Sequence, residues 1–443
     1  MSNASNMKTQ ILFFFMLTVK LYGQNFISYF SGNTTDALTV PKGGICLMGG
    51  STEDDNAMKW FLQQADGGDV LVLRTSGANG YNSYLYSALG IPVNSVETIV
   101  CNNSLASYDP YVLQKIQNAE AIWFAGGNQW TYISYWRNTP VDSLINLGIK
   151  QRNVVVGGTS AGMAIMGQYY FTAQNGTITS SAALANPYSV NLTVDSVSFL
   201  KNQLLENVIT DTHFDNPDRK GRLVAFMSRI IQDYNVKSNA IACDEYTAVC
   251  VDTNGMARVF GGYPSYDDNA YFLQVNCDLT NQWPENCSSG NPLTWDLSGR
   301  AIKVYSVKGT PNGSGSFDLK DWKNGNNGNW LEWSVDTGFL NEALSTSPIC
   351  STSNEKTDDF MNDVLFYPNP VTQSLHIFSE RNSIKNCSVK IIDAAGNSIE
   401  ANDIRLKDKE LYISSDNLKE GIYLIMILKD EKILAAKKII KIQ

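Results

Sequence analysis

Histidine is almost absent from this sequence: only His213 and His376 occur among its 443 residues. This excludes a metal site built from several histidines, and no two cysteines have the spacing of a zinc-binding Cys-x-x-Cys pair. The sequence therefore predicts no metal or organic cofactor and offers very few candidates for a general base. Charged residues are also few, at 17% against 43% hydrophobic residues, which favours a folded chain over a disordered one.

Positive charge is scarcer than negative charge, with 34 Lys and Arg against 43 Asp and Glu, giving a formal net charge of -9 at pH 7. An acidic surface repels phosphate backbones, so the composition argues against a nucleic-acid partner. The same surface would tolerate or attract a cationic substrate. The length exceeds that of one small domain and fits two or three, and the oligomeric state, a dimer included, stays open.

The N-terminus carries an apolar run that fits a targeting signal, and no later segment reaches the roughly 18 apolar residues of a membrane helix. Lys8 gives a short positive start, residues 11–19 are apolar, and Gly23 is a small residue suited to cleavage. This pattern predicts a signal peptide over residues 1–24, within which residues 1–6 resemble an expression remnant. A buried core strand is the alternative interpretation. We therefore expect an exported protein, secreted or held at the cell surface.

Eight cysteines fit an exported chain, because disulfides persist in oxidising compartments. Cys277 and Cys287 flank a short polar loop, and we expect them to pair with each other. The sequence alone leaves the remaining connectivity open.

From about residue 43 to residue 160 the sequence alternates apolar runs with segments of helical spacing. Asp109-Pro110 supplies the cap and the first-turn residue that open a helix. Because the strand runs are continuously apolar, the pattern predicts a parallel sheet covered by helices on both faces, an α/β fold. The predicted strands are 44–48, 70–73, 96–101, 120–124 and 154–156.

The pattern changes after about residue 235. Residues 240–251 and 257–260 read as antiparallel strands joined by a turn. Residues 261–300 are rich in Asn, Asp, Ser and Pro and are expected to be mostly loop. One more strand is predicted at 301–307, and the many Gly and Asn of 308–330 predict a mobile loop.

The C-terminal region begins after a polar linker predicted over residues 345–362. Residues 363–443 contain short alternating strands, which predict a small all-β sandwich. The segment Tyr367–Val371, the later Asp393–Gly396 and the Lys-rich end resemble the C-terminal sorting domain of type IX secretion cargo. The resemblance implies export across an outer membrane and contact with the type IX machinery. An ordinary β-sandwich binding module is the alternative.

The segment Gly158–Gly162 reads Gly-Thr-Ser-Ala-Gly and stands between a valine-rich strand and an apolar helix. A strand, a sharp turn and a helix form the context of a nucleophile elbow, which exposes Ser160 above the sheet edge. The helix N-terminus and the N–H of Ala161 would favour an oxyanion there. An ordinary tight turn is the alternative.

A nucleophilic serine needs a base, and His213 is the only histidine before the C-terminal region. A third residue should be a carboxylate that orients the imidazole. Asp244 and Glu245 follow a predicted strand, and since neighbouring strand residues point to opposite faces, only one of them can face His213. The order Ser, His, acid differs from that of α/β-hydrolases, in which histidine comes last.

Several motifs in this order resemble the cyanophycinase and dipeptidase E group of serine peptidases over about residues 40–310. The resemblance implies a glutamine-amidotransferase-like three-layer α/β/α sandwich with a mainly parallel sheet, spanning residues 25–344. The motifs are Leu47–Gly50, Phe124–Gln129, Gly157–Gly162, Asp211–Phe214 and Asp244–Ala248.

The resemblance also implies residue roles. It implies Ser160 as nucleophile, His213 as base and Glu245 as orienting acid, with the amides of Gly127 and Ala161 as the oxyanion hole. The residues that it places near the substrate are Gln129, Asn128, Thr179, Ser180, Arg219 and Arg222.

Three positions depart from the family pattern: Asn128 stands where Asp is common, Thr212 where Gln is common, and Pro217 where cyanophycinases carry Arg. Cyanophycinases cleave an aspartate–arginine polymer into β-aspartyl-arginine dipeptides. We therefore predict an exported serine exopeptidase that hydrolyses aspartyl or β-aspartyl peptides containing Asp and Arg, with short peptides preferred over the polymer. A catalytically inactive surface-binding protein that keeps the fold is the alternative.

Overall fold

The computed structural model describes residues 24–350, 364–367, 370–379, 387–393, 397–399, 404–407, 410–429 and 432–442. The chain divides into two compact units, Met1–Cys350 and Ser351–Gln443. This division falls inside the linker predicted over 345–362. The predicted signal peptide, apart from Gln24, and the linker residues 351–362 lie outside the described residues.

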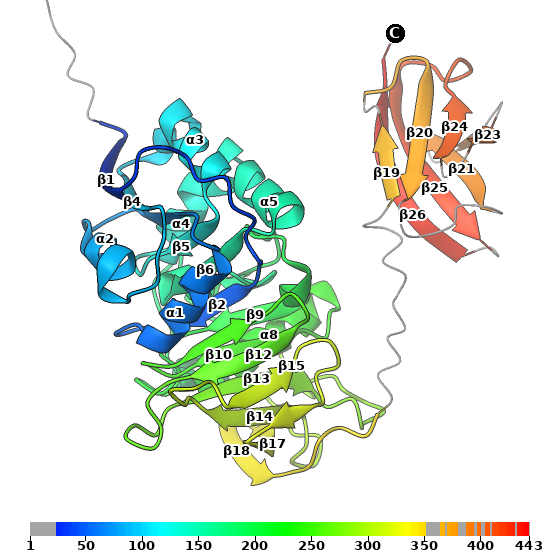
Figure 1. Cartoon of the computed structure of the whole chain (residues 1–443). Helices are drawn as coiled ribbons and strands as arrows, with labels where there is room; N and C mark the ends of the chain where they lie inside the picture. The colour runs from blue at the N-terminus through cyan, green and yellow to red at the C-terminus, as the bar shows by residue number, and fades with distance from the viewer. Residues whose placement is uncertain are drawn as a thin grey trace, which may run out of the picture. The chain divides into compact units, whose positions relative to one another are not determined.

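The first unit contains a ten-stranded mixed sheet (Figure 1). Five parallel strands form its core in the order β4, β3, β5, β6, β2, and β1 pairs antiparallel with β4 at the edge. Beyond β2 the sheet continues antiparallel through β11, β12, β15 and β16. In sheet order the strands are β1 (Phe26–Gly32), β4 (Ser95–Cys101), β3 (Asp69–Arg74), β5 (Ala121–Phe124), β6 (Val155–Thr159), β2 (Ile45–Met48), β11 (Ala248–Val251), β12 (Met256–Phe260), β15 (Gly315–Asp318) and β16 (Gly325–Asn326).

Helices cover both faces of the parallel core, which confirms the predicted α/β class. Alternate residues of one strand point to opposite faces. Thus Cys46 and Met48 pack with α1 (Asp55–Gln64), whereas Ile45 and Leu47 belong to the cluster that includes helix residues on the other face. The helices of that second face are α3 (Pro110–Asn118), α4 (Gln129–Trp136), α5 (Pro140–Arg152) and α6 (Ala161–Ala164).

The start of α3 is capped as the sequence predicts. The Asp109 side chain accepts a hydrogen bond from the N–H of Tyr111, and Pro110 occupies the first turn. Asp54 caps α1 in the same way, accepting from the N–H groups of Asn56 and Ala57. Such caps stabilise a helix by about 1 kcal/mol each, because they satisfy N–H groups that have no partner in the first turn.

A second, six-stranded sheet completes the first unit. Only β9 and β10 run parallel in it, and α8 (Lys220–Tyr234) packs on one face. The other face shares a hydrophobic cluster with the antiparallel half of the first sheet, so the two sheets pack against each other. The strands in order are β18 (Phe339–Leu344), β17 (Gly328–Asp336), β14 (Ile302–Lys308), β13 (Asn269–Val275), β10 (Asn239–Cys243) and β9 (Val208–Asp211).

The prediction of a mobile loop over 308–330 is wrong, because β15, β16 and the start of β17 form there. Its glycines serve close packing instead of flexibility. A Cβ at Gly325 or Gly328 would collide with the Tyr305 ring, and one at Gly315 would collide with Val307. The segment 261–300 is mostly loop, as the sequence predicts, apart from the strand β13.

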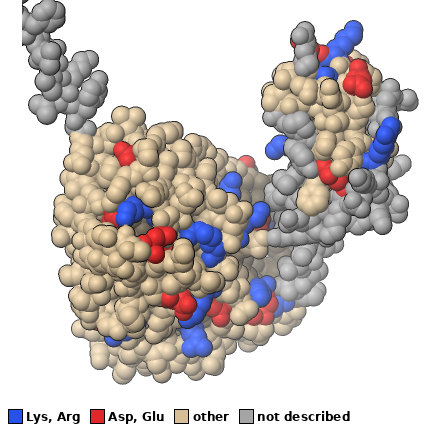
Figure 2. Space-filling model, turned by 45° about the horizontal axis from the view of Figure 1, so that its top comes forward, with Lys and Arg blue, Asp and Glu red and all other residues tan. Residues whose placement is uncertain are grey.

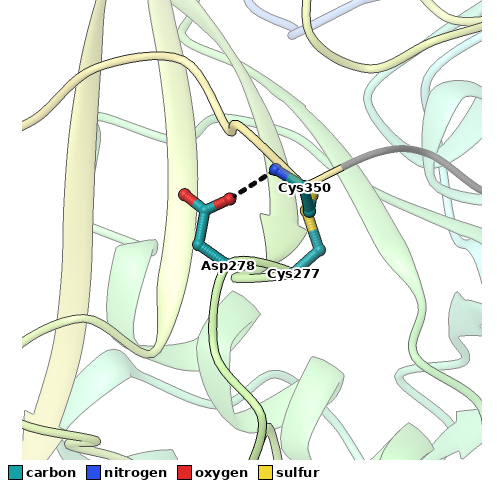
Figure 3. A group of neighbouring side chains, drawn as sticks. All are labelled: Cys277, Asp278 and Cys350. Atoms are coloured by element: carbon teal, nitrogen blue, oxygen red, sulfur yellow. Dashed lines mark hydrogen bonds between the residues drawn. A yellow bond between two sulfur atoms is a disulfide. The ribbon is translucent and has the colours of Figure 1, made fainter.

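The predicted Cys277–Cys287 pair is also wrong. Cys277 is bonded to Cys350, with a Cα–Cα distance of 5.8 Å (Figure 3). Cys287 is a buried free thiol whose sulfur lies 3.6 Å from Ser228 Oγ. Asp278 draws Cys350 towards Cys277, because its Oδ1 accepts hydrogen bonds of 2.8 Å from the N–H groups of Ile349 and Cys350. Both sulfurs of this group are used by the disulfide, so the group offers no thiolate to a metal.

Residues 345–350, here called the strap, belong to the first unit. Lys303 is buried, and its Nζ lies 2.8 Å from both Glu332 Oε1 and Ser345 Oγ. The same amine donates to the carbonyl of Thr346. The strap therefore satisfies a buried charge as well as carrying Cys350, and an unsatisfied buried charge is costly.

The second unit is an all-β structure of two four-stranded antiparallel sheets, which confirms the predicted all-β fold. Its core includes Leu375, Ile377, Ile391 and Ile425, which lie on strands of both sheets. The first sheet contains β19 (Val364–Tyr367), β20 (Ser374–Ser379), β24 (Glu410–Ser414) and β23 (Ile404–Lys407); the second contains β22 (Ser398–Ile399), β21 (Ser388–Asp393), β25 (Gly421–Lys429) and β26 (Lys432–Lys441).

The surface carries mixed charge. On the face drawn in Figure 2, Lys and Arg side chains lie among Asp and Glu side chains and many uncharged residues. Among the residues that the structure describes, no helix combines the length and apolar character needed to cross a bilayer.

Truncation of the chain tests this division into units. A chain ending at Asn362 is expected to fold and to keep the thermal stability of the first unit, because the strap and its disulfide remain. A chain ending at Leu344 loses both, and its thermal midpoint is expected to fall by roughly 5–15 °C. Calorimetry on the two truncated chains measures the difference. Equal midpoints would show that the strap contributes nothing to stability.

Candidate active site

Ser160 occupies a sharp turn between β6 and α6. Its backbone has φ 51° and ψ -116°, a conformation that residues other than glycine rarely adopt and that costs about 1–3 kcal/mol. The two flanking glycines are needed for packing: a Cβ at Gly158 would strike the backbone of Gly162, and one at Gly162 would strike the carbonyl of Phe124. The turn therefore has the form of the predicted nucleophile elbow.

His213 lies just after β9, facing Ser160. Its Nε2 is 2.8 Å from Ser160 Oγ. The backbone N–H of His213 donates to Gly49 O at 2.8 Å, and that of Ser160 donates to Met48 O at 3.1 Å. The imidazole occupies the space that a side chain at Gly50 would need, so this position must stay glycine. The end of β2 thus positions both residues.

Glu245 follows β10 and approaches the other ring nitrogen, with its Oε1 2.5 Å from His213 Nδ1. Burial raises the pKa of the Glu245 carboxyl, but hydrogen bonds from His213 and Ser51 outweigh burial and lower the pKa overall. The group is therefore ionised at neutral pH and can hold the imidazole in one tautomer. The backbone N–H of Glu245 donates to Asp215 Oδ1 at 2.8 Å, which holds the start of the turn between β10 and β11 in place.

Asp244 points elsewhere, as expected for the neighbour of Glu245 on an extended segment. It is 3% exposed, and its Oδ2 accepts a hydrogen bond of 2.7 Å from the N–H of Asn269. Burial raises the pKa of this carboxyl to about 7. The Asp244 side chain contacts Asn269 and not His213, so the structure brings Glu245, and not Asp244, to the imidazole.

A cavity of about 190 Å³ opens beside Ser160 and His213. Of the predicted site residues it also brings together Gln129, Ala161, Arg219 and Arg222. The remaining lining residues are Ala164, Phe171, Ala173, Thr177, Asp211 and Thr212.

Arg222 is a buried part of the cavity wall. Its guanidinium forms a bidentate ion pair with the Asp211 carboxylate, and the distance between Arg222 Nε and Asp211 Oδ2 is 2.9 Å. Arg219 donates to the carbonyl of Thr212 at 2.9 Å, and burial, followed by the charge of Arg222, lowers the pKa of its guanidinium. Asp211 pairs with Arg222, whereas Arg219 forms no ion pair among residues 24–350 and experiences the charges of Asp211, Glu245 and Asp215 from a greater distance.

Three predicted substrate residues have structural roles instead of lining the cavity. Asn128 and Thr179 cap helices, accepting from the N–H groups of Thr131 and Ala182 respectively. Ser180 Oγ, in the first turn of α7 (Ser180–Ala185), donates to Asp218 O at 2.9 Å. None of the three lines the cavity, so their direct contact with a substrate stays a prediction.

The predicted oxyanion-hole residues lie next to the elbow. Ala161 is the first residue of α6, a position whose N–H has no partner within its own helix. Gly127 follows Gly126, whose built Cβ would lie 3.8 Å from Ser160 Cβ. The role of the two amides stays a prediction.

Sequence reasoning did not single out Phe171, Ala173 or Thr177 as site residues, and it gave Asp211 no role of its own. Phe171 lies on the short strand β7 (Tyr170–Phe171) and stacks on Phe226, and the guanidinium of Arg222 lies over both rings. No local motif marks this segment. The one available signal was its position shortly before Thr179 and Ser180, which the resemblance places near the substrate.

The second unit contains a similar hydrogen-bond chain. Ser374 Oγ lies 3.0 Å from His376 Nε2, and His376 Nδ1 lies 2.8 Å from Glu410 Oε1. Ser374 stands within the paired strand β20 and not at an elbow, so its neighbours' amides serve strand pairing and do not converge on a reacting carbonyl. The hydrogen-bonded group Ser374–His376–Glu410 therefore serves as an internal control for Ser160–His213–Glu245.

Two family models match segments of the chain. Residues 81–259, which include Ser160, His213 and Glu245, match the model of peptidase family S51, and residues 365–442 match that of the secretion system C-terminal sorting domain. The resemblance to a peptidase family and to a sorting domain is thereby confirmed over these segments.

The curated relatives are cyanophycinases. The chain is 26% identical to the one from Trichormus variabilis over 150 residues, or 34% of this chain and 45% of the relative, so it spans about half that protein's length. It is 23% identical to one from Synechococcus elongatus over 239 residues, or 52% of this chain and 68% of the relative.

Two solved structures are similar. A peptidase from an acI-B1 Actinobacterium has a TM-score of 0.39 and 14% identity, covering 52% of this chain and 90% of that one. A putative peptidase E protein from Listeria monocytogenes has a TM-score of 0.33 and 17% identity, covering 50% and 98%. Scores this low carry no argument, so the fold rests on the sheet topology described above.

Proposed function

We propose that this protein is an exported serine exopeptidase that hydrolyses aspartyl or β-aspartyl peptide bonds. The observation that carries the proposal is the hydrogen-bond chain from Ser160 Oγ through His213 to Glu245, with separations of 2.8 and 2.5 Å, beside a cavity. Nucleophile, base and orienting acid stand in the order that acyl transfer requires. The match to a peptidase family supports the reaction class.

In the proposed mechanism His213 Nε2 takes the proton of Ser160 as the serine oxygen attacks the amide carbonyl. The carbonyl oxygen becomes an oxyanion, which the amides of Ala161 and Gly127 are proposed to bind. The C–N bond then breaks as His213 gives its proton to the leaving amine. Water, deprotonated by His213, hydrolyses the acyl-enzyme and restores Ser160.

The charge of the cavity supports an acidic substrate side chain. Arg222 is paired with Asp211, whereas among residues 24–350 Arg219 forms no ion pair. A guanidinium without a carboxylate partner is suited to bind one from the substrate. The small volume of about 190 Å³ favours a short side chain such as aspartyl. The relatives' name, cyanophycinase, points the same way.

Replacement of Arg219 by Met tests this assignment. The variant is expected to lose about 10- to 100-fold in kcat/KM on aspartyl and β-aspartyl dipeptides, because the substrate carboxylate loses a charged partner. A neutral analogue, in which Asn replaces Asp, should lose much less. Arg258→Met, at an exposed position on β12, serves as the matched control. An equal loss on both substrates would contradict carboxylate recognition by Arg219.

Two experiments test the proposed function itself. A screen of aspartyl and β-aspartyl peptides, with the insoluble aspartate–arginine polymer included, should show hydrolysis of short peptides. A fluorophosphonate probe should label Ser160, as mapped by mass spectrometry. Absence of labelling in the folded protein would favour the alternative, an inactive surface-binding protein of the same fold.

Export and its partner form part of the proposal. The sorting-domain match over residues 365–442 supports delivery by the type IX machinery to the cell surface or exterior. The signal peptide over residues 1–24 stays a prediction, as does the role of the machinery as a partner.

A further inference from the structure

Three buried free thiols lie on or beside β2, the strand whose end positions Ser160 and His213. The proposed reaction uses none of them. Cys46 lies on β2, Cys250 on β11 and Cys243 at the end of β10. All three are at most 1% exposed. The sulfur of Cys243 points at the backbone carbonyl of Leu47, at 3.8 Å. The other two sulfurs face each other.

Cys46 and Cys250 are direct cross-strand partners. The strands β2 and β11 are antiparallel, and their register places Cys250 opposite Cys46. The two sulfur atoms are 3.7 Å apart, at the distance of a thiol–thiol hydrogen bond. Opposite residues in an antiparallel pair have Cβ atoms about 4.5–5.5 Å apart, close to the roughly 3.5–4.5 Å that a disulfide needs. A small approach of the two side chains would therefore allow the bond.

We propose that Cys46 and Cys250 form a cross-strand disulfide in the exported protein. Each thiol gives up one proton and one electron as the sulfur–sulfur bond forms. The two electrons and two protons pass to a disulfide oxidant, such as an exported thiol oxidoreductase or oxidised glutathione, which is reduced to two thiols by exchange. The sorting-domain match supports passage through a compartment where disulfides persist.

The bond has to form before the strands are fully packed. In the folded protein, burial and then the hydrogen bond to Cys46 raise the pKa of the Cys250 thiol, which suppresses the reactive thiolate. No oxidant reaches thiols that are at most 1% exposed. Oxidation therefore belongs to folding, and a protein folded under reducing conditions keeps both thiols.

The proposed Cys46–Cys250 disulfide would join β2 and β11, the two strands next to the active site. The end of β2 accepts hydrogen bonds from the N–H groups of Ser160 and His213, through Met48 O and Gly49 O. Just before β11, Thr247 O accepts from Gly49 N, and Glu245 stands two residues earlier. A Cys46–Cys250 bond thus fixes the separation between the part carrying serine and histidine and the part carrying the acid. It also closes a loop of about 200 residues, which favours stabilisation.

Non-reducing peptide mapping of the full chain tests the proposal. The protein is folded with oxidised or with reduced glutathione, free thiols are blocked with iodoacetamide under denaturing conditions, and the digest is examined by mass spectrometry. Oxidative folding should link the Cys46 and Cys250 peptides, with the loss of two hydrogen atoms. Alkylation of both cysteines after oxidative folding, or a link from Cys46 to Cys243, would overturn the proposal.

Alanine variants supply a second readout that does not depend on the proposed hydrolysis. Oxidative folding should raise the thermal midpoint of the wild type by several degrees more than that of Cys46→Ala or Cys250→Ala. The control Cys101→Ala, a buried free thiol on β4 of the same sheet, should keep the full increment. The Cys277–Cys350 bond is common to all variants and cancels. An equal increment in all four proteins would count against the Cys46–Cys250 disulfide, and mapping of the wild type decides the case if a variant fails to fold.

Discussion

Replacement of Ser160 by alanine is expected to lower turnover on aspartyl peptides by at least roughly four orders of magnitude. Ser160 Oγ lies 2.8 Å from His213 Nε2, and no other hydroxyl among the cavity-lining residues has a histidine as its hydrogen-bond partner. Alanine keeps the Cβ, so the strained elbow at φ 51° is no worse than in the wild type. Turnover is measured on purified protein, with circular dichroism to verify folding.

The matched control is Ser374→Ala in the second unit. Ser374 makes the same kind of contact, 3.0 Å to His376 Nε2, but on a regular strand. This variant should keep full activity and full fluorophosphonate labelling at Ser160. Residual turnover above a hundredth of wild type in Ser160→Ala, or labelling of Ser374, would show that the nucleophile has been assigned to the wrong serine.

Glu245→Gln is expected to keep the fold and to reduce turnover by roughly two to four orders of magnitude. The glutamine amide can donate to Nδ1 and so favours the tautomer in which Nε2 carries the proton, which leaves His213 unable to accept from Ser160. The loss should appear in kcat more than in KM, because Glu245 acts through the imidazole. Steady-state kinetics on one dipeptide substrate separates the two parameters.

Asp244→Asn is the control for this change, since it alters the adjacent carboxyl. It should affect turnover by less than about tenfold, because Asp244 contacts Asn269 and not His213. Burial raises the pKa of Asp244 from 3.8 to about 7. The folded state therefore holds this proton up to about pH 7, and the free energy of unfolding of the wild type falls as pH rises from about 4 to 7. The Asn variant should lack this part of the fall, as urea unfolding at several pH values measures. If Asp244→Asn proved the more damaging change to turnover, the assignment of the orienting acid would be reversed.

Local patterns in the sequence were sufficient to predict features whose interactions lie within one short segment. The parallel strands were visible because a strand buried on both faces must be continuously apolar, as at 154–156. The cap at Asp109 could be predicted because its own side chain reaches the N–H of Tyr111. The elbow at Ser160 could be predicted because only small neighbours let that turn close.

Long-range features were decided only by the tertiary structure. Cys277 bonds to Cys350 across 73 residues because Asp278 binds the strap, and no spacing rule contains that contact. The glycines of 308–330 are typical of a flexible loop in the sequence, but in the structure the Tyr305 ring fills the place of a side chain at Gly325 and Gly328, and Val307 does so at Gly315.

The site divides in the same way. The residue types that could act were predictable from the sequence, because a single histidine precedes the C-terminal region and only one of two adjacent carboxylates can face it. The tertiary structure decided what surrounds them. It placed Arg222 against Asp211, left Arg219 with its charge towards the cavity, and used Asn128 and Thr179 as helix caps. The physical reason is that charge compensation and cavity shape depend on residues from separate strands and helices, whose proximity is set by packing of the whole unit.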